Sequence, residues 1–304
     1  MKHVRTSLRP VTAVLIAIAA SSFVTAHASD YYLRRNQDSG WHWHTTTAGN
    51  PNSWHTTPEG RAVQATSMDP AGHYHTRGHQ LRSPEDSGEV SFQGAKLILD
   101  DRGSLALKTA NGVTARALVQ HLETRGASTI TAGNAGHYHN LTITTFDQAG
   151  TTTFIAVAGR SHDLTIGTLS GNGTLVFSGG STGSNFRIAS IDNAADFAGT
   201  FSLAGGTLRF SSNLDAANAA LSLETGTLVH LTHSVTVSTL AIAGHTLGTG
   251  SYDYTYLKNN YGNTFIAGDA RNGRIVVGGI PDPSTYTAVL TGAVSLAARS
   301  GSGY

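Results

Sequence analysis

Apolar and polar residues alternate with period two along most of the chain, most regularly between Leu164 and Leu247. Successive side chains of a β-strand point to opposite faces, so each short segment carries one apolar row and one polar row. One such strand buries little of its apolar row, whereas a stack of them buries all of it. The pattern therefore predicts an all-β fold, a right-handed parallel β-helix or β-solenoid. The phrase Gly-Thr-Leu, interpreted as a turn residue followed by the start of a strand, occurs at Gly167, Gly173, Gly206 and Gly226.

The alternation also predicts which residues form the core and where strands end. Regular alternation begins at Val90, and the sequence from Asp100 to Gly103 is typical of a corner between strands. Residues 113–123 fit helical as well as strand spacing, and their strand-rich neighbours favour a strand. Residues 264–266 and 274–277 are expected to form a closing hairpin, with helix limited mainly to the two chain ends. The residues expected to point inward include Leu175, Phe177, Leu208, Phe210, Leu221 and Leu223.

The chain begins with the pattern of a secretory signal peptide over residues 1–28. Three basic residues precede an apolar run, and Ala26-His27-Ala28 has the small-x-small form of a cleavage site. The run is too short to span a bilayer, so the sequence favours export over anchoring. The mature protein is expected to begin at Ser29.

Residues 29–88 differ from the rest in composition. All three tryptophans lie here, four prolines interrupt the segment, and alternation is poor. The terminal repeats of a solenoid need an atypical cover, because an open end exposes apolar side chains and unpaired strand edges. This segment is therefore predicted to be an irregular N-terminal cap, followed by solenoid repeats over residues 89–279.

The charge balance excludes one class of partner. The whole chain has 20 Lys and Arg against 19 Asp and Glu, and removing the three basic residues of the signal leaves 17 against 19, a net charge of −2. A protein without a basic surplus is not expected to bind nucleic acid. The sequence contains no cysteine, which excludes disulfides and thiolate chemistry. We expect no cofactor.

The glycine-rich phrases also carry a resemblance. The segments Leu169-Ser170-Gly171-Asn172-Gly173-Thr174-Leu175 and Phe197-Ala198-Gly199-Thr200-Phe201, with Gly206-Thr207-Leu208, resemble autotransporter-associated β-strand repeats. Such repeats build right-handed β-helical, passenger-like regions of secreted bacterial proteins. The resemblance covers about half of the mature chain.

The tail, residues 280–304, carries a second resemblance. Pro281-Asp282-Pro283, followed by an apolar run and Arg299, is similar to a PEP-CTERM sorting signal, which implies an exosortase as a processing partner. Asp282 stands where that family has Glu, so the tail is a degenerate form. The twelve residues of this run, 287–298, would form a helix of roughly 18 Å, short of a hydrocarbon core about 30 Å thick. A Pro-bounded flap that packs on the last repeat is the alternative. Together the resemblances imply a Gram-negative host and an extracellular or outer-surface location.

Histidine is the reactive residue type in excess. Three His-x-His pairs, each able to present two imidazoles on one strand face to Zn²⁺ or Cu²⁺, are His42/His44, His73/His75 and His137/His139. Two pairs lie in an identical Ala-Gly-His-Tyr-His phrase. The alternative is a polar corner motif, and no carboxylate recurs at a fixed spacing to complete a site. We expect the pairs not to converge and the protein to hold no stoichiometric metal.

Candidate catalytic residues are few. Gly179 to Gly183 matches G-x-S-x-G, but no helix follows to form the nucleophile elbow. Asp100 with Asp101, and His162 with Asp163, are explained equally well by turns. The sequence favours a non-enzymatic secreted or cell-surface protein, a structural, adhesive or exopolysaccharide-associated matrix component that holds glycans on Tyr and Trp faces. The alternative is a β-helix carbohydrate-active enzyme such as a polysaccharide lyase.

Overall fold

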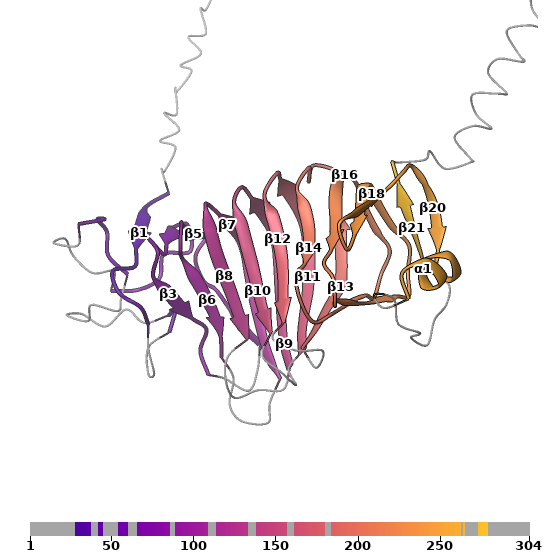
Figure 1. The fold of residues 1–304 in the computed structure, drawn as a ribbon. Helices are drawn as coiled ribbons and strands as arrows, with labels where there is room; N and C mark the ends of the chain where they lie inside the picture. The colour runs from indigo at the N-terminus through magenta and orange to yellow at the C-terminus, as the bar shows by residue number, and fades with distance from the viewer. Residues whose placement is uncertain are drawn as a thin grey trace, which may run out of the picture.

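Two long β-sheets wind around one apolar core in the computed structural model (Figure 1). The structure describes residues 28–37, 42–44, 54–59, 66–85, 89–108, 114–132, 138–156, 161–179, 184–262, 264 and 273–278. Sheet A contains β1 (Asp30–Tyr32), β2 (His73–His75), β4 (Glu89–Ser91), β5 (Lys96–Leu99), β7 (Ala115–Thr124), β9 (Tyr138–Gln148), β11 (Ser161–Gly171), β13 (Asn185–Asn193), β15 (Thr207–Phe210) and β17 (Leu228–Leu231). Sheet B contains β3 (Gln80–Arg82), β6 (Ser104–Leu107), β8 (Ala127–Ala132), β10 (Thr151–Ala156), β12 (Thr174–Gly179), β14 (Thr200–Leu203), β16 (Leu214–Leu223), β18 (Val235–Ile242), β19 (His245–Leu247), β20 (Gly250–Asp253) and β21 (Arg274–Val277).

From β7 to β18 the chain alternates between the two sheets, and each strand pairs in parallel with the strand one turn earlier. Ser161 on β11, for example, lies beside Tyr138 on β9, and the register continues without a shift to Gly171 beside Gln148. This arrangement confirms the predicted all-β parallel solenoid. Its right-handed sense stays a prediction.

The core follows the predicted alternation. All six residues expected to point inward are at most 2% exposed. Like residues stack between turns: the rings of Phe154 and Phe177 lie parallel, with centroids 5.4 Å apart. Residues 113–123 fit both helical and strand spacing in the sequence. They contribute to strand β7, as their strand-rich neighbours predicted. For the six residues expected to point inward, local alternation correctly indicated the buried row.

Glycines at the corners allow successive turns to stack closely. A Cβ atom on Gly173 would lie 2.1 Å from the carbonyl oxygen of Gly150, one turn earlier, and that oxygen accepts a hydrogen bond from the backbone N–H of Thr174. Gly173, Gly206 and Gly226 precede strands as predicted. The prediction is wrong for Gly167, which lies inside β11. The corner from Asp100 to Gly103 is confirmed by a hydrogen bond from the Gly103 N–H to the Asp100 carbonyl, 2.7 Å.

Aromatic residues fill the N-terminal end of the core. Trp43 and Trp54 have no exposed surface, and the Tyr74 ring packs against the rings of Trp54 and Phe92, with centroids 4.9 and 5.3 Å away. Strands stack earlier than the predicted start at Val90, because β1 and β2 pair in parallel and β2 pairs with β5.

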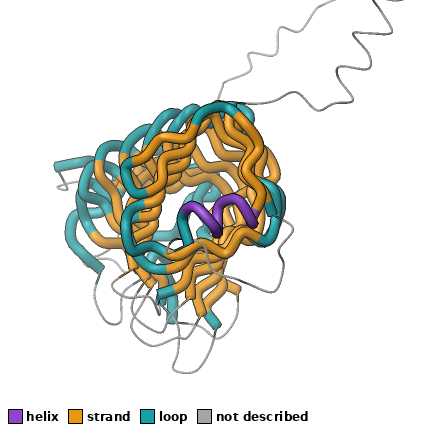
Figure 2. The backbone as a smooth tube through the Cα atoms, turned by 45° about the vertical axis from the view of Figure 1, so that its right-hand side comes forward, coloured by secondary structure: helices purple, strands orange, loops and turns teal. Residues whose placement is uncertain are grey.

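The C-terminal end departs from the predicted closing hairpin. Strand β21 pairs in parallel with β18 and antiparallel with β20, so its hairpin partner is Gly250–Asp253. Helix α1 (Tyr254–Asn260) follows β20 and lies across the end of the coil (Figure 2). This seven-residue helix lies outside the two chain ends, to which helix was expected to be mainly limited. The Asp253 side chain caps the helix by accepting the Tyr256 N–H at 2.7 Å, and Leu257 is fully buried.

The predicted signal peptide and sorting tail lie outside the described residues, apart from Ala28. Within the part of the chain that the structure describes, no helix is long and apolar enough to cross a membrane.

Candidate functional site

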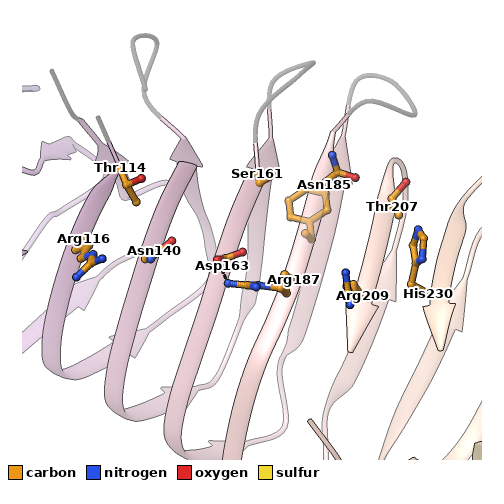
Figure 3. A pocket seen from close by; sticks show the side chains of 11 residues that line it. Thr114, Arg116, Asn140, Ser161, Asp163, Asn185, Arg187, Thr207, Arg209 and His230 are labelled. Carbon is orange, nitrogen blue, oxygen red and sulfur yellow. Dashed lines mark hydrogen bonds and ion pairs between the residues drawn. The ribbon is translucent and has the colours of Figure 1, made fainter. Parts of the chain in front are cut away.

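A groove of about 440 Å³ runs across the outer face of sheet A (Figure 3). We call it the outer groove, and its lining residues are Thr114, Arg116, Asn140, Ser161, Asp163, Asn185, Phe186, Arg187, Thr207, Arg209 and His230. A second hollow of about 190 Å³ shares four of these residues and extends to Glu89. The two hollows are therefore parts of one continuous depression.

One side chain from each turn forms a row along this groove. The row runs from β7 to β17 through Arg116, Asn140, Asp163, Arg187, Arg209 and His230. Each member is the register partner of the next, and Figure 3 shows them on successive strands. The residue that follows each member of the row along its strand points inward. Because these neighbours are buried in the core, the polar row lies on the outer face of sheet A.

Charge within the row is partly neutralised. Arg187 donates a hydrogen bond to Asp163, whose side chain is only 15% exposed. Arg116 and Arg209 are exposed and form no ion pair with any described residue. Within the lining, three guanidinium groups face one carboxylate, and the adjoining hollow adds a second carboxylate, Glu89, beside Arg116 in the register of β4 and β7. The depression as a whole therefore has a small excess of positive charge.

The floor of the groove contains an unsatisfied acceptor. The Asn140 side-chain oxygen is buried and has no hydrogen-bond partner among the residues that the structure describes. Buried polar atoms are almost always hydrogen-bonded, so such an atom at a groove floor indicates a place for a ligand donor.

A second charged cluster lies on the same face near the ends of β7 and β9. The His121 ring lies 2.6 Å from Asp147, and the Ser170 hydroxyl donates to the other oxygen of that carboxylate at 2.5 Å. The serine therefore contacts the carboxylate and not the imidazole, unlike a nucleophile that a histidine base activates.

Glu123 lies beside Asp147 in the register of β7 and β9. Lys96 donates to Glu123 at 2.9 Å, and Arg125 pairs with it as well. Burial acts to raise the pKa of each carboxyl, but the bonds from these cations, and from Ser170 and His121 to Asp147, outweigh it and lower both pKa values. A general acid needs a raised pKa, so this carboxylate pair does not fit glycosidase chemistry.

The first two predicted histidine pairs have separate surroundings. Burial lowers the pKa of His42 and of His44, and the His44 ring lies 2.9 Å from the Ser91 carbonyl. His73 and His75 lie on one face of β2, as their spacing predicts, and both approach the Asp30 carboxylate, at 3.6 and 3.5 Å. No pattern in the sequence pointed to this carboxylate, which the pairing of β1 with β2 brings beside the histidines.

The third predicted pair, His137 and His139, differs from the first two because its one described member is buried in the core. His137 lies outside the described residues, and His139 is fully buried beside His162, with ring centroids 5.7 Å apart. In the described part of the chain, no group of three His, Asp or Glu side chains is arranged to hold a metal ion. The expectation of a metal-free protein stays a prediction.

The remaining residues considered as catalytic candidates, where they are described, belong to strands and corners of the solenoid. His162 points inward and Asp163 outward, as neighbours on a strand must, so they do not form an orienting pair. Asp100 accepts the Arg77 N–H and Asp101 accepts the Ala127 N–H, both at 2.9 Å, which confirms their role in a corner. Of the segment 179–183, only Gly179 is described.

The predicted aromatic glycan faces need a correction for two of the three tryptophans, while Trp41 lies outside the described residues and Tyr256 is 45% exposed. Trp43 and Trp54 have no exposed surface, so neither can stack on a sugar. They fill the end of the core, because a large ring buries more apolar area there than any other side chain.

Comparisons of the chain with known protein families, with curated proteins and with solved structures gave no match. The candidate site therefore depends on the geometry alone. Sequence reasoning missed the outer groove, although one signal was present: polar residues recur at intervals of one turn in the row from Arg116 to His230.

Proposed function

We propose that the protein is a non-enzymatic, secreted or cell-surface β-solenoid, a structural or adhesive component of an extracellular matrix that associates with exopolysaccharide. The observation that carries the proposal is the outer groove, an open depression in which each of six successive turns presents a polar or charged side chain in one row. A repeating row suits a repeating polymer, because each added unit of the ligand meets another turn of the wall.

The paired carboxylates also favour a binding role over catalysis. Glu123 and Asp147 are each held by cationic or hydrogen-bonding partners that lower their pKa values. The outer groove itself contains one carboxylate, Asp163, which is bound to Arg187. A glycosidase requires two carboxyl groups with separate roles, and one of them must stay protonated.

Export and surface location belong to the same proposal. The strand β1 begins at Asp30, two residues after the predicted cleavage at Ala28, so cleavage there would leave the strand intact. The secretion machinery is then a partner, and an exosortase acts on the tail if Pro281 to Pro283 still functions as a sorting motif. Intact mass of protein recovered from the native host tests both ends: a chain that starts at Met1 would contradict export, and one that ends at Tyr304 would contradict processing.

Incubation of residues 29–279 with acidic and neutral polysaccharides tests the absence of catalysis. We expect retention of the protein in an affinity gel that contains a polysaccharide, with no new ultraviolet absorbance from unsaturated products and no new reducing ends. Depolymerisation of any of these polymers would establish the alternative, a carbohydrate-active enzyme such as a polysaccharide lyase.

A further inference from the structure

We propose that the outer groove binds a linear acidic polysaccharide that lies along the solenoid axis, with its carboxylate groups on Arg116 and Arg209 and a hydroxyl group on Asn140. This inference rests on the proposed function and adds the class of ligand, its direction and the residues that hold it.

The two arginines provide the charge selection. Arg116 on β7 and Arg209 on β15 are exposed and form no ion pair within the described part of the chain. A guanidinium group donates two parallel hydrogen bonds to a carboxylate, a geometry that a neutral sugar does not satisfy. Arg187 lies between them in the row but is already bound to Asp163, so we assign it to the floor and not to ligand binding.

Asn140 provides the polar floor. Its side-chain oxygen is buried and lacks a hydrogen-bond donor among the described residues. That oxygen has almost no accessible surface, so a sugar hydroxyl reaches it when the Asn140 side chain turns toward the groove, and the hydroxyl then donates the missing bond. A carboxylate has no O–H group to donate at neutral pH. The ligand therefore needs hydroxyl groups as well as acidic groups.

The dimensions of the row favour a polymer over a small anion. Neighbouring strands lie about 4.8 Å apart, so the row from β7 to β17 extends over roughly 24 Å. Because the row crosses the strands, an extended chain that contacts both arginines lies parallel to the solenoid axis. A single acidic sugar is too short to contact both.

The lining favours a polysaccharide over a single-stranded nucleic acid. Proteins that bind single strands stack the bases on exposed aromatic rings. Among the residues that the structure describes, Phe186 is the only Phe, Tyr or Trp that lines the outer groove, and it is 2% exposed. The other lining side chains carry hydroxyl, amide, imidazole or charged groups, which match a hydroxyl-rich ligand.

Calorimetric titration of residues 29–279 with polygalacturonate, with its oligosaccharides of increasing length, with neutral dextran and with single-stranded DNA tests this inference. We expect affinity to increase with oligosaccharide length until the row is covered, and no binding of dextran. Arg116→Gln and Arg209→Gln are each expected to weaken binding by roughly tenfold, and Asn140→Ala by less. Arg274→Gln is the matched control, because Arg274 is an exposed strand arginine on β21 in sheet B, outside the groove.

All three arginines are exposed, and circular dichroism checks that each variant is folded. Equal affinity for dextran, tighter binding of DNA, or no loss of affinity in the Arg116→Gln/Arg209→Gln variant would overturn the inference. Polysaccharide binding that survives this double variant would leave the proposed function standing and refute only this site. Cleavage of polygalacturonate would instead refute the proposed function.

Discussion

The same five-residue phrase, Ala-Gly-His-Tyr-His, occurs twice in the chain and is placed in opposite phase. In the first copy Tyr74 is fully buried, and His73 and His75 on either side of it face outward. In the second copy the last histidine, His139, is fully buried. An identical local sequence therefore does not determine which side chains enter the core.

The residues around each copy explain the difference. After His139 the chain continues with Leu141 and Ile143 at period two, and these two buried apolar residues place His139 in the inward row of the first half of β9. The first copy forms a strand of only three residues, and the Tyr74 ring fits among aromatic rings, including Tyr31 stacked 4.8 Å away. A shift of one residue would exchange the faces, so the neighbouring apolar residues decide the phase.

Removal of the inward tyrosine of the first copy should have the largest effect. Tyr74→Ala is expected to reduce the free energy of unfolding by about 3–5 kcal/mol, because it leaves a cavity within an aromatic cluster. Denaturant unfolding of residues 29–279 measures the loss. Tyr256→Ala is the control, since Tyr256 is 45% exposed. A loss below about 1 kcal/mol for Tyr74→Ala would refute the assigned phase.

The inward histidines near the second copy should make stability depend on pH. Burial lowers the pKa of His162, which lies beside His139 and donates a hydrogen bond from Nε2 to the Ile155 carbonyl at 2.8 Å. The unfolded chain therefore binds a proton that the folded chain excludes. Stability should fall as the pH drops below about 6.5, by at most about 1.4 kcal/mol per pH unit for this group.

The variant His162→Phe tests whether His162 causes this dependence of stability on pH. Phenylalanine suits the position, because Phe186 occupies the same place one turn later and stacks on the His162 ring at 5.9 Å. We expect the unfolding free energy of the variant to decline less steeply between pH 6.5 and pH 5 than that of the unaltered chain. Equal slopes in the two proteins would show that His162 does not titrate on unfolding.

Removal of an outward histidine of the first copy should have a smaller effect. His73 is about one-third exposed and contacts the half-exposed Asp30. Surface ion pairs contribute little, so His73→Ala is expected to cost less than about 1 kcal/mol in thermal unfolding. A loss as large as that of Tyr74→Ala would indicate that the first copy is buried in the opposite phase.

The smallest expected effect concerns metal. We expect the purified protein to contain no stoichiometric Zn²⁺ or Cu²⁺ after mild chelation, and addition of Zn²⁺ to leave its unfolding temperature unchanged. Elemental analysis and thermal unfolding check this. Zinc that is retained by the protein and lost in His73→Ala would contradict it.

The candidate site was only partly predictable. The sequence indicated a polysaccharide-associated surface, but it favoured Tyr and Trp faces, whereas Trp43 and Trp54 are buried. It also missed Arg116 and Arg209, which are 93 positions apart and have no local motif in common. They lie in one row because the turns between them have nearly equal lengths, a property of the corners and not of the arginines.

The sequence by itself determined the fold class and most of the core. Alternation is a local property of a strand. The buried face can therefore be predicted without the rest of the chain for Leu175 and Phe177, and likewise for Leu221 and Leu223. Only the tertiary structure decided the phase of the repeated phrase, the partner of β21, the helix α1 across the C-terminal end and the row along the outer groove. These features depend on which strand lies beside which, and that register is set by contacts between residues far apart in the chain.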